Sequence, residues 1–200
     1  MNAPFRPKAA ALALAALVSP ACLSLTPDAP PPVRWLSIMP SASRPGTSQT
    51  GVTTPEPNVP RLRLGSVTAS DAITDQYIRR ISAVELQYAD FVRWAESPAV
   101  VVERLLEDEL FQRQGFTLDT RATRRLDVEI IAFEEQQIPR RQGHIAIIAK
   151  LVAEDGQALV NRRFEATLPV DGEDPALVAE ALTEGIQRVA REVGELIALK

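Results

Sequence analysis

The chain has 200 residues, of which 46% are hydrophobic and 24% are charged, a balance typical of a water-soluble globular domain. Lysine and arginine number 22 against 26 aspartate and glutamate, so the formal charge is −4 and the composition argues against a nucleic-acid partner. A single cysteine excludes an intrachain disulfide, and the fold must therefore be held together by its core.

The N-terminus has the layout of a bacterial export signal. Its first eight residues carry two basic side chains and no acid, the next ten are apolar, and small residues precede Cys22. The apolar run is about half the length that a bilayer-spanning helix requires. We therefore predict a cleaved signal peptide over residues 1–21 and lipid attachment at Cys22. Release of a soluble protein is the alternative, because residues 19–21 also suit ordinary signal peptidase.

A proline-rich stretch follows the signal. Proline fixes φ and removes backbone donors, so residues 22–60 are predicted to form an extended tether before a folded domain at 61–200. One island, residues 33–38, alternates enough to add an edge strand to a sheet. The alternative for this island is an apolar patch within the linker.

Three strands are predicted at the start of the folded part. A short strand-like run covers residues 62–67, and residues 77–81 and 84–88 form two strands with a tight connection. In the last of these, Val84, Leu86 and Tyr88 share one face.

A first helix is predicted from Ser97, whose hydroxyl is a capping group and which is followed by Pro98 at the first helical position. Its buried stripe is formed by Val101, Val102, Leu105, Leu106 and Leu110. Gly115 lies where this helix is expected to stop.

Hairpin strands and a second helix are predicted in the second half. Apolar residues alternate from Leu126, shift phase at Ile131, which indicates a bulge, and alternate again over residues 145–151 and 160–168 around an Asp155–Gly156 turn. Asp174 and Pro175 then begin a helix whose stripe is Val178, Leu182, Ile186, Val189, Val193 and Ile197. Its outer face carries the i,i+4 pairs Glu184–Arg188, Arg188–Glu192 and Arg191–Glu195. The pattern predicts an α+β, two-layer sandwich: a mostly antiparallel sheet with two long amphipathic helices on one face.

The sequence offers little chemistry for catalysis. The only histidine, His144, lies among branched aliphatics and is interpreted as a strand-surface residue. Four acids, Asp127, Glu129, Glu134 and Glu135, are interpreted as a solvated sheet face. Neither a metal site nor a serine triad is supported, because both need several convergent groups. We therefore predict a non-enzymatic protein with no catalytic residues, metal or cofactor.

Three aromatic residues lie close together before the first helix. Trp94 has two interpretations, packing in the core or at the cap, which is favoured, and anchoring a partner. Phe91 and Tyr88 nearby favour an exposed aromatic patch, because such residues dominate interface energetics. All three are candidate partner contacts.

Several short motifs resemble the ABC-type transport auxiliary lipoproteins, the PqiC-like family. The motifs are the Tyr77–Ile81 and Val84–Tyr88 strands, the Arg93–Pro98 segment, Trp35–Leu36, Cys22, and Asp155–Gly156 before a strand bearing Phe164. Together they cover most of the chain from Cys22 to Leu199. The proline-rich insertion and the serine three positions before Cys22 depart from the family pattern.

The resemblance implies a lipid-anchored periplasmic subunit at the Gram-negative outer membrane. It also implies a partnership with an MCE-type protein of an ABC system that moves lipids. No nucleic-acid partner is expected, and the chain could form a homo-oligomer. The alternative is a carrier, anchored or soluble in the periplasm, that binds a lipid tail between sheet and helices. A carrier requires a continuous apolar cavity of several hundred Å³. A docking subunit is expected to have a filled core and an exposed apolar patch. A periplasmic enzyme is a third reading, with little support.

Overall fold

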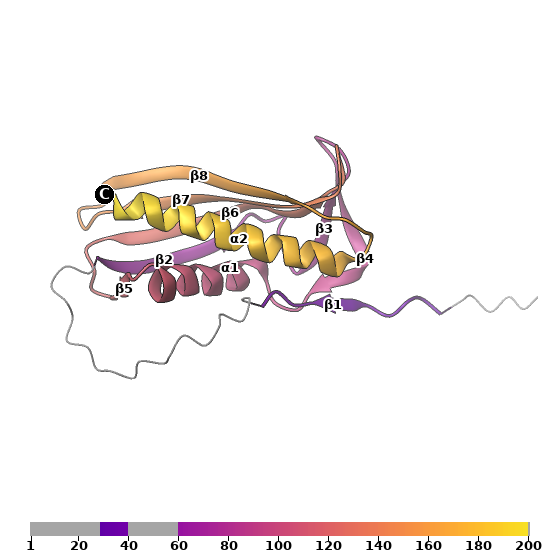
Figure 1. The fold of residues 1–200 in the computed structure, drawn as a ribbon, viewed down its shortest axis with the longest axis horizontal. Coiled ribbons are helices and arrows are strands. Elements are labelled where there is room, and N and C mark those ends of the chain that lie inside the picture. The colour runs from indigo at the N-terminus through magenta and orange to yellow at the C-terminus, as the bar shows by residue number, and fades with distance from the viewer. Residues whose placement is uncertain (1–28, 40–59, 200) are drawn as a thin grey trace, which may run out of the picture. The chain divides into compact units, whose positions relative to one another are not determined.

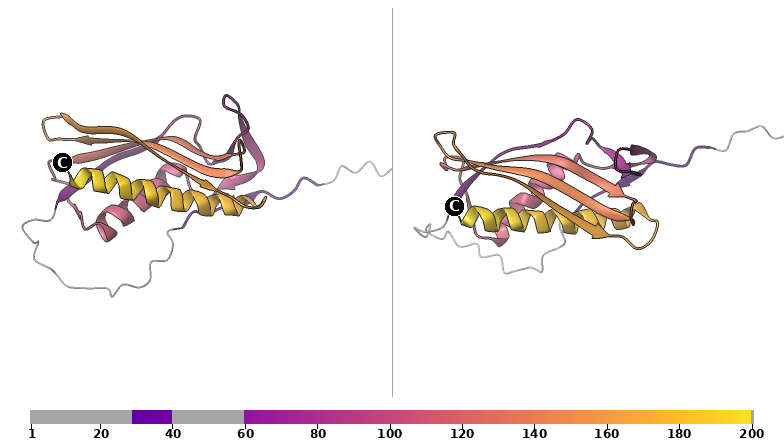
Figure 2. Two further views of the ribbon diagram at one scale, coloured as in Figure 1. Left: turned by 45° about the horizontal axis from the view of Figure 1, so that its top comes forward. Right: turned by 90° about the horizontal axis from the view of Figure 1, so that it is seen from above.

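A mixed, mostly antiparallel sheet with two helices packed on it makes up the fold, so the predicted α+β class is confirmed (Figure 1). The computed structural model describes residues 29–39 and 60–199. The strands are β1 Arg34–Leu36, β2 Arg61–Ala69, β3 Gln76–Arg80, β4 Leu86–Trp94, β5 Thr117–Leu118, β6 Arg125–Gln136, β7 Gln142–Val152 and β8 Ala158–Pro169. The helices are α1 Pro98–Glu107 and α2 Pro175–Ala198. Both lie on the same face of the sheet (Figure 2).

β6 is the centre of the sheet. One of its edges pairs with β7 in antiparallel register over its whole length, and β7 pairs in the same way with β8. The other edge is shared by two strands, because β2 runs parallel to the first half of β6 and β3 runs parallel to its last two residues. β5 extends the sheet beyond β2, and β4 and β1 extend it beyond β3.

The predicted edge strand at residues 33–38 is present as β1, which pairs in parallel with β4. Leu36 and Ile38 are buried in the core, whereas the Trp35 side chain is 61% exposed. Arg34 Nη2 lies 2.8 Å from Asp174 Oδ1 at the start of α2. β1 is therefore held by backbone pairing, by two buried side chains and by an ion pair.

The β3–β4 hairpin is present, but β4 is longer than predicted. It begins at Leu86 rather than Val84 and continues through Trp94, with a shift of register near its middle. Val84 belongs to the connection and is 93% exposed. Leu86 and Tyr88 share a face because they lie opposite Arg80 and Ile78 of β3. The bulge carries the strand further than simple alternation indicates.

α1 begins as predicted, with Ser97 Oγ accepting a hydrogen bond from the backbone N–H of Val100 at 3.5 Å. The five residues of its predicted stripe are buried. The helix continues into a π-helical segment, η1 Asp108–Arg113, and the chain leaves the helix at Gly115, whose φ is +76°. Only glycine adopts such a φ without cost, so Gly115 ends the helix.

α2 also matches its prediction. Asp174 caps the helix by accepting from the N–H of Ala176 at 3.0 Å, and the whole predicted stripe is buried. Of the predicted ladder, Arg188 pairs with Glu184 at 3.1 Å. Arg191 instead reaches across to Glu109 of η1, with 3.5 Å between Nε and Oε1.

The hairpins that carry the helices follow the predicted pattern. β6 and β7 shift register between Ile130 and Ala132, which is the bulge expected from the phase change at Ile131. β7 and β8 are joined by a turn in which Gly156 has a φ of +85°. Phe164, Ala166 and Leu168 of β8 are buried, as predicted.

Three predictions concern residues outside the described ranges: the signal peptide, lipidation at Cys22 and the proline-rich part of the tether. In residues 29–39 and 60–199, neither helix has the length and hydropathy that a membrane span requires.

Candidate docking surface and buried polar network

Trp94 lies in the core, with 3% of its surface exposed. Its ring is 5.2 Å from that of Tyr77 and 5.1 Å, edge to face, from that of Phe133. Such pairs add to the stability gained from burial alone. The packing interpretation of Trp94 therefore describes the structure, and this side chain offers no surface to a partner.

The β3–β4 hairpin carries four of the exposed large apolar side chains. Val84, Leu86, Tyr88 and Phe91 are 93%, 37%, 43% and 38% exposed. Tyr88 is fixed at its tip, where the hydroxyl donates a 3.2 Å hydrogen bond to the carbonyl of Ala72. We call these four residues the hairpin patch. It lies at the opposite end of the sheet from β5 (Figure 1).

Two surface hollows flank α2. One, of about 600 Å³, lies beside β1 and includes Trp35, Met39, Ala179 and Thr183 in its lining. The other, of about 470 Å³, lies beside β8. Glu180 and Glu184 line both hollows, so acidic side chains stand between them. The space between sheet and helices is occupied by the buried side chains of the core.

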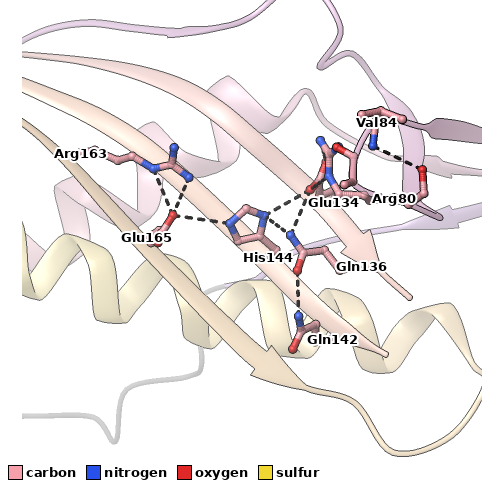
Figure 3. A network of polar contacts seen from close by, with 10 residues as sticks. Arg80, Val84, Glu134, Gln136, Gln142, His144, Arg163 and Glu165 are labelled. Atoms are coloured by element: carbon pink, nitrogen blue, oxygen red, sulfur yellow. Dashed lines mark hydrogen bonds and ion pairs between the residues drawn. The ribbon is translucent and has the colours of Figure 1, made fainter. Parts of the chain in front are cut away.

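A network of polar side chains crosses β3, β6, β7 and β8 on one face of the sheet, centred on Glu134 (Figure 3). The Glu134 side chain is only 3% exposed, and Arg80 donates to it twice, at 2.6 and 3.0 Å. Burial raises the pKa of Glu134, but its contacts with His144 and Arg80 outweigh burial and lower that pKa to about 2. Glu134 is therefore a buried carboxylate that keeps its charge.

His144 continues the network and is 9% exposed, so its interpretation as a strand-surface residue is wrong. Its Nδ1 lies 2.8 Å from the amide nitrogen of Gln136 and 3.2 Å from Glu134. Gln136 in turn accepts a 2.8 Å hydrogen bond from Gln142. The Nε2 atom of His144 lies 3.9 Å from Glu165 Oε2 on β8.

The opposite face of β6 holds a second buried carboxylate, Glu135, which is 2% exposed. It accepts from the Tyr77 hydroxyl at 2.7 Å, from Arg79 at 3.2 Å and from Arg141 at 2.6 Å. Burial raises the pKa of Glu135, but hydrogen bonds from Arg141 and Tyr77 and the nearby arginine charges lower it below its usual value. Burial, with the bond to Glu135, raises the pKa of Tyr77.

The predicted solvated face of four acids is thus correct for only part of β6. Glu129 is exposed and Asp127 is half-buried, but Glu134 and Glu135 are buried. The reason is that β3 joins the edge of β6 at this point, with Arg79 opposite Glu135 and Arg80 beside Glu134. Two adjacent arginines, Arg79 and Arg80, and two adjacent acids, Glu134 and Glu135, are a sequence pattern that could have indicated ion pairs between strands. Which arginine meets which acid depends on the register of β3 on β6.

The network joins four strands by ion pairs and hydrogen bonds, and its best-supported role is structural. Glu134 and Glu135 each have at least two donors, which is what burial of charge requires. Within residues 29–39 and 60–199, no group of three or more metal-ligating side chains converges.

Comparison with known proteins identifies the family of the chain. Residues 43–194 match the family described as ABC-type transport auxiliary lipoprotein component. The chain belongs to this family. Membership makes it an auxiliary lipoprotein component of an ABC-type transport system, which implies a non-catalytic role and anchoring to a membrane through lipid.

Solved structures share the fold. Protein XCC0632 of Xanthomonas campestris, of family DUF330, superposes with a TM-score of 0.67 at 19% identity, covering 84% of this chain and 100% of its own. An uncharacterized protein superposes with a TM-score of 0.60 at 17% identity, covering 69% of this chain and 92% of its own. No curated protein gives a significant match.

Proposed function

We propose that this protein is a non-enzymatic docking subunit, anchored in the outer membrane through Cys22, that contacts an MCE-type protein of a lipid-moving ABC system from the periplasm. The family supplies the transport system and the lipid anchor. The outer membrane, the MCE-type partner and the lipid cargo are what this proposal adds to the family assignment. Leu23, rather than an aspartate, follows Cys22, which favours the outer membrane.

The observation that carries docking is the hairpin patch. Large apolar side chains exposed together on one hairpin are typical of an interaction surface, whereas single exposed ones need no explanation. Tyr88 and Phe91 are the aromatic types that dominate interface energetics. β3 and β4, which carry the patch, also contribute Tyr77 and Trp94 to the core, where Trp94 packs against Tyr77 and Phe133, so the patch is presented by a rigid support.

The carrier alternative has weaker support. A lipid tail needs a continuous apolar cavity, and the two hollows beside α2 lie at the surface with Glu180 and Glu184 in their linings. Acidic rims also repel the phosphate of a common phospholipid. A carrier remains the second candidate, with the hollow beside β1 and its Met39 and Trp35 as its site.

The test of anchored docking is complementation of a deletion strain. Wild-type protein is compared, at matched abundance, with a Cys22→Ala variant exported behind a soluble signal. Anchoring confines the domain to one membrane face and raises its effective concentration at the machine, so wild type is expected to rescue better. Full rescue by the soluble form would reject the anchored model and favour a diffusing carrier.

A second test addresses the hairpin patch itself. The double variant Leu86→Glu/Phe91→Glu is expected to lose co-purification with the MCE-type partner. The control is Leu118→Glu, which places one such charge at a 52% exposed leucine of β5, and it is compared with each of the single variants Leu86→Glu and Phe91→Glu as well as with the double variant. Melting temperatures close to wild type show that each variant is folded. Retention of the partner by the double variant would reject the hairpin patch as the docking surface.

A further inference from the structure

A small pocket at the β5 end of the sheet gathers three arginines, of which only Arg125 has a carboxylate partner among the described residues. It encloses about 250 Å³, and its lining includes Arg63, Thr120, Arg121, Thr123, Arg125 and Glu154. Its walls are the loop before β6, the start of β2 and the β7–β8 turn. We call it the arginine pocket. At about 30 Å³ for each water, it has room for about eight waters, or for a phosphate group and part of its ester.

Two of the arginines are forced together by the sheet. Arg63 of β2 and Arg125 of β6 lie directly opposite one another in parallel register. Leu62 and Leu126 beside them are buried in the core, so the two guanidinium groups project from the other face. Like charges at directly opposed positions destabilise a sheet. Such a pair is retained at a cost, unless an anion lies between them.

The charges of these arginines are only partly balanced. Arg125 donates to Asp127 at 3.0 Å, but among residues 29–39 and 60–199 no carboxylate pairs with Arg63 or Arg121. Arg63 Nε is buried and has no hydrogen-bond partner within this part of the chain. A buried donor without a partner carries the full cost of its desolvation. The one acid in the lining, Glu154, is exposed at the rim.

The walls of the arginine pocket are held in place by specific contacts. The backbone N–H of Arg121 donates to the Asp119 carboxylate at 2.8 Å. The backbone N–H of Arg63 donates to the carbonyl of Arg124 at 3.0 Å. At the β2 bulge, a Cβ on Gly65 would lie 2.1 Å from Asp127 Oδ1, so glycine is needed there. Asp127, which also accepts from Ser66 N–H at 3.1 Å, then orients Arg125. The pocket is preorganised.

We propose that the arginine pocket binds a phosphate-type anion, whether free phosphate or the headgroup of an anionic phospholipid. Guanidinium groups match the oxygens of phosphate in geometry and in charge. The hydroxyls of Thr120 and Thr123 add two donors at the same opening. This site is separate from the hairpin patch, and the proposal stands whether or not docking occurs there.

The test uses the exported chain with Cys22→Ala, so that no acyl chain contributes to binding. Inorganic phosphate is titrated while the backbone amides of residues 119–125 and 153–156 are followed by NMR. In a second arm, the protein is sedimented with vesicles of phosphatidylcholine alone or mixed with phosphatidylglycerol. Arg121→Ala removes an exposed loop cation and is expected to weaken binding by about tenfold or more, while Arg163→Ala on β8 leaves it unchanged.

The outcomes divide cleanly. Phosphate binding that Arg121→Ala weakens supports the site, and added binding to phosphatidylglycerol vesicles assigns the anion to a lipid headgroup. Vesicle binding without phosphate binding supports the lipid source alone. If wild type binds neither probe, or if Arg121→Ala binds as wild type does, or if Arg163→Ala weakens binding equally, the proposal is overturned. Arg63→Met is the second variant, and its melting temperature separates loss of fold from loss of site.

Discussion

The contact between Arg80 and Glu134 allows a quantitative prediction, because one carboxylate in the centre of the sheet depends on one arginine. Replacing Arg80 by Met keeps much of the side-chain volume and removes both hydrogen bonds to Glu134. Glu134 is then buried without its main counter-charge. The protein must either keep an unpaired buried charge or protonate it, and both lower the free energy of unfolding.

The magnitude follows from the pKa. A shift from 4.5 to about 2 is ~2.5 units, and at about 1.4 kcal/mol per unit it amounts to about 3 kcal/mol of stability at neutral pH. Because the pKa of Glu134 is lower in the folded state, this stability is present above pH ~4.5 and is lost as pH falls towards ~2. Arg80 is 31% exposed, so its removal is expected to cost about 2–3 kcal/mol near pH 7.

Urea unfolding of wild type and Arg80→Met at about pH 7 and about pH 3.5 measures this effect. The difference between the two proteins is expected to narrow by about 1 kcal/mol at the lower pH, where wild type has lost part of the contribution. Arg163→Met, at an exposed pair on β8, is the matched control and should cost under about 1 kcal/mol. An equal difference at both pH values would refute the reasoning, since the loss would then be one of packing.

Two further predictions concern the helices and the N-terminus. Leu105→Ala or Ile186→Ala should lower the free energy of unfolding by about 2–5 kcal/mol, whereas Glu107→Ala or Arg188→Ala should lower it by well under about 1 kcal/mol. Denaturant titration measures both, and equal costs would contradict the assignment of the buried and exposed helix faces. Mass spectrometry of the mature N-terminus should find Cys22 acylated, and an unmodified cysteine after cleavage at Ala21 would remove the anchor from the proposal.

The helices could be predicted from the sequence because their signals are local. Ser97 and Asp174 cap them, prolines follow the caps, and the stripes of α1 and α2 repeat at helical spacing. The hairpins of β6, β7 and β8 were also local enough to predict. The branching of the sheet was not, because β2 and β3 share one edge of β6 and no local pattern encodes that division.

The same division explains what was missed at the candidate sites. Asp127 and Glu129 alternate with apolar residues as in a solvated strand, and the adjacent Glu134 and Glu135 were assigned to the same face, but β3 pairs with β6 at this point and buries them. Trp94 was assigned two interpretations because a strand and a cap meet at that residue. The arginine pocket joins Arg63 to a loop about sixty residues later, and only the register of β2 on β6 brings them together. Long-range register is thus what separates the predicted fold from the observed sites.

The strand β1 has a consequence for how far the protein reaches from a membrane. With Cys22 anchored, the chain between Cys22 and the first strand of the sheet acts as a leash. If the fold began at β2, this leash would be 39 residues long and would span at most about 140 Å. Because β1 is part of the sheet, the leash ends at Arg34, 12 residues from Cys22, and spans at most about 40 Å. β1 has only three residues and one neighbouring strand, so its release would lengthen the leash more than threefold while the rest of the sheet stays paired.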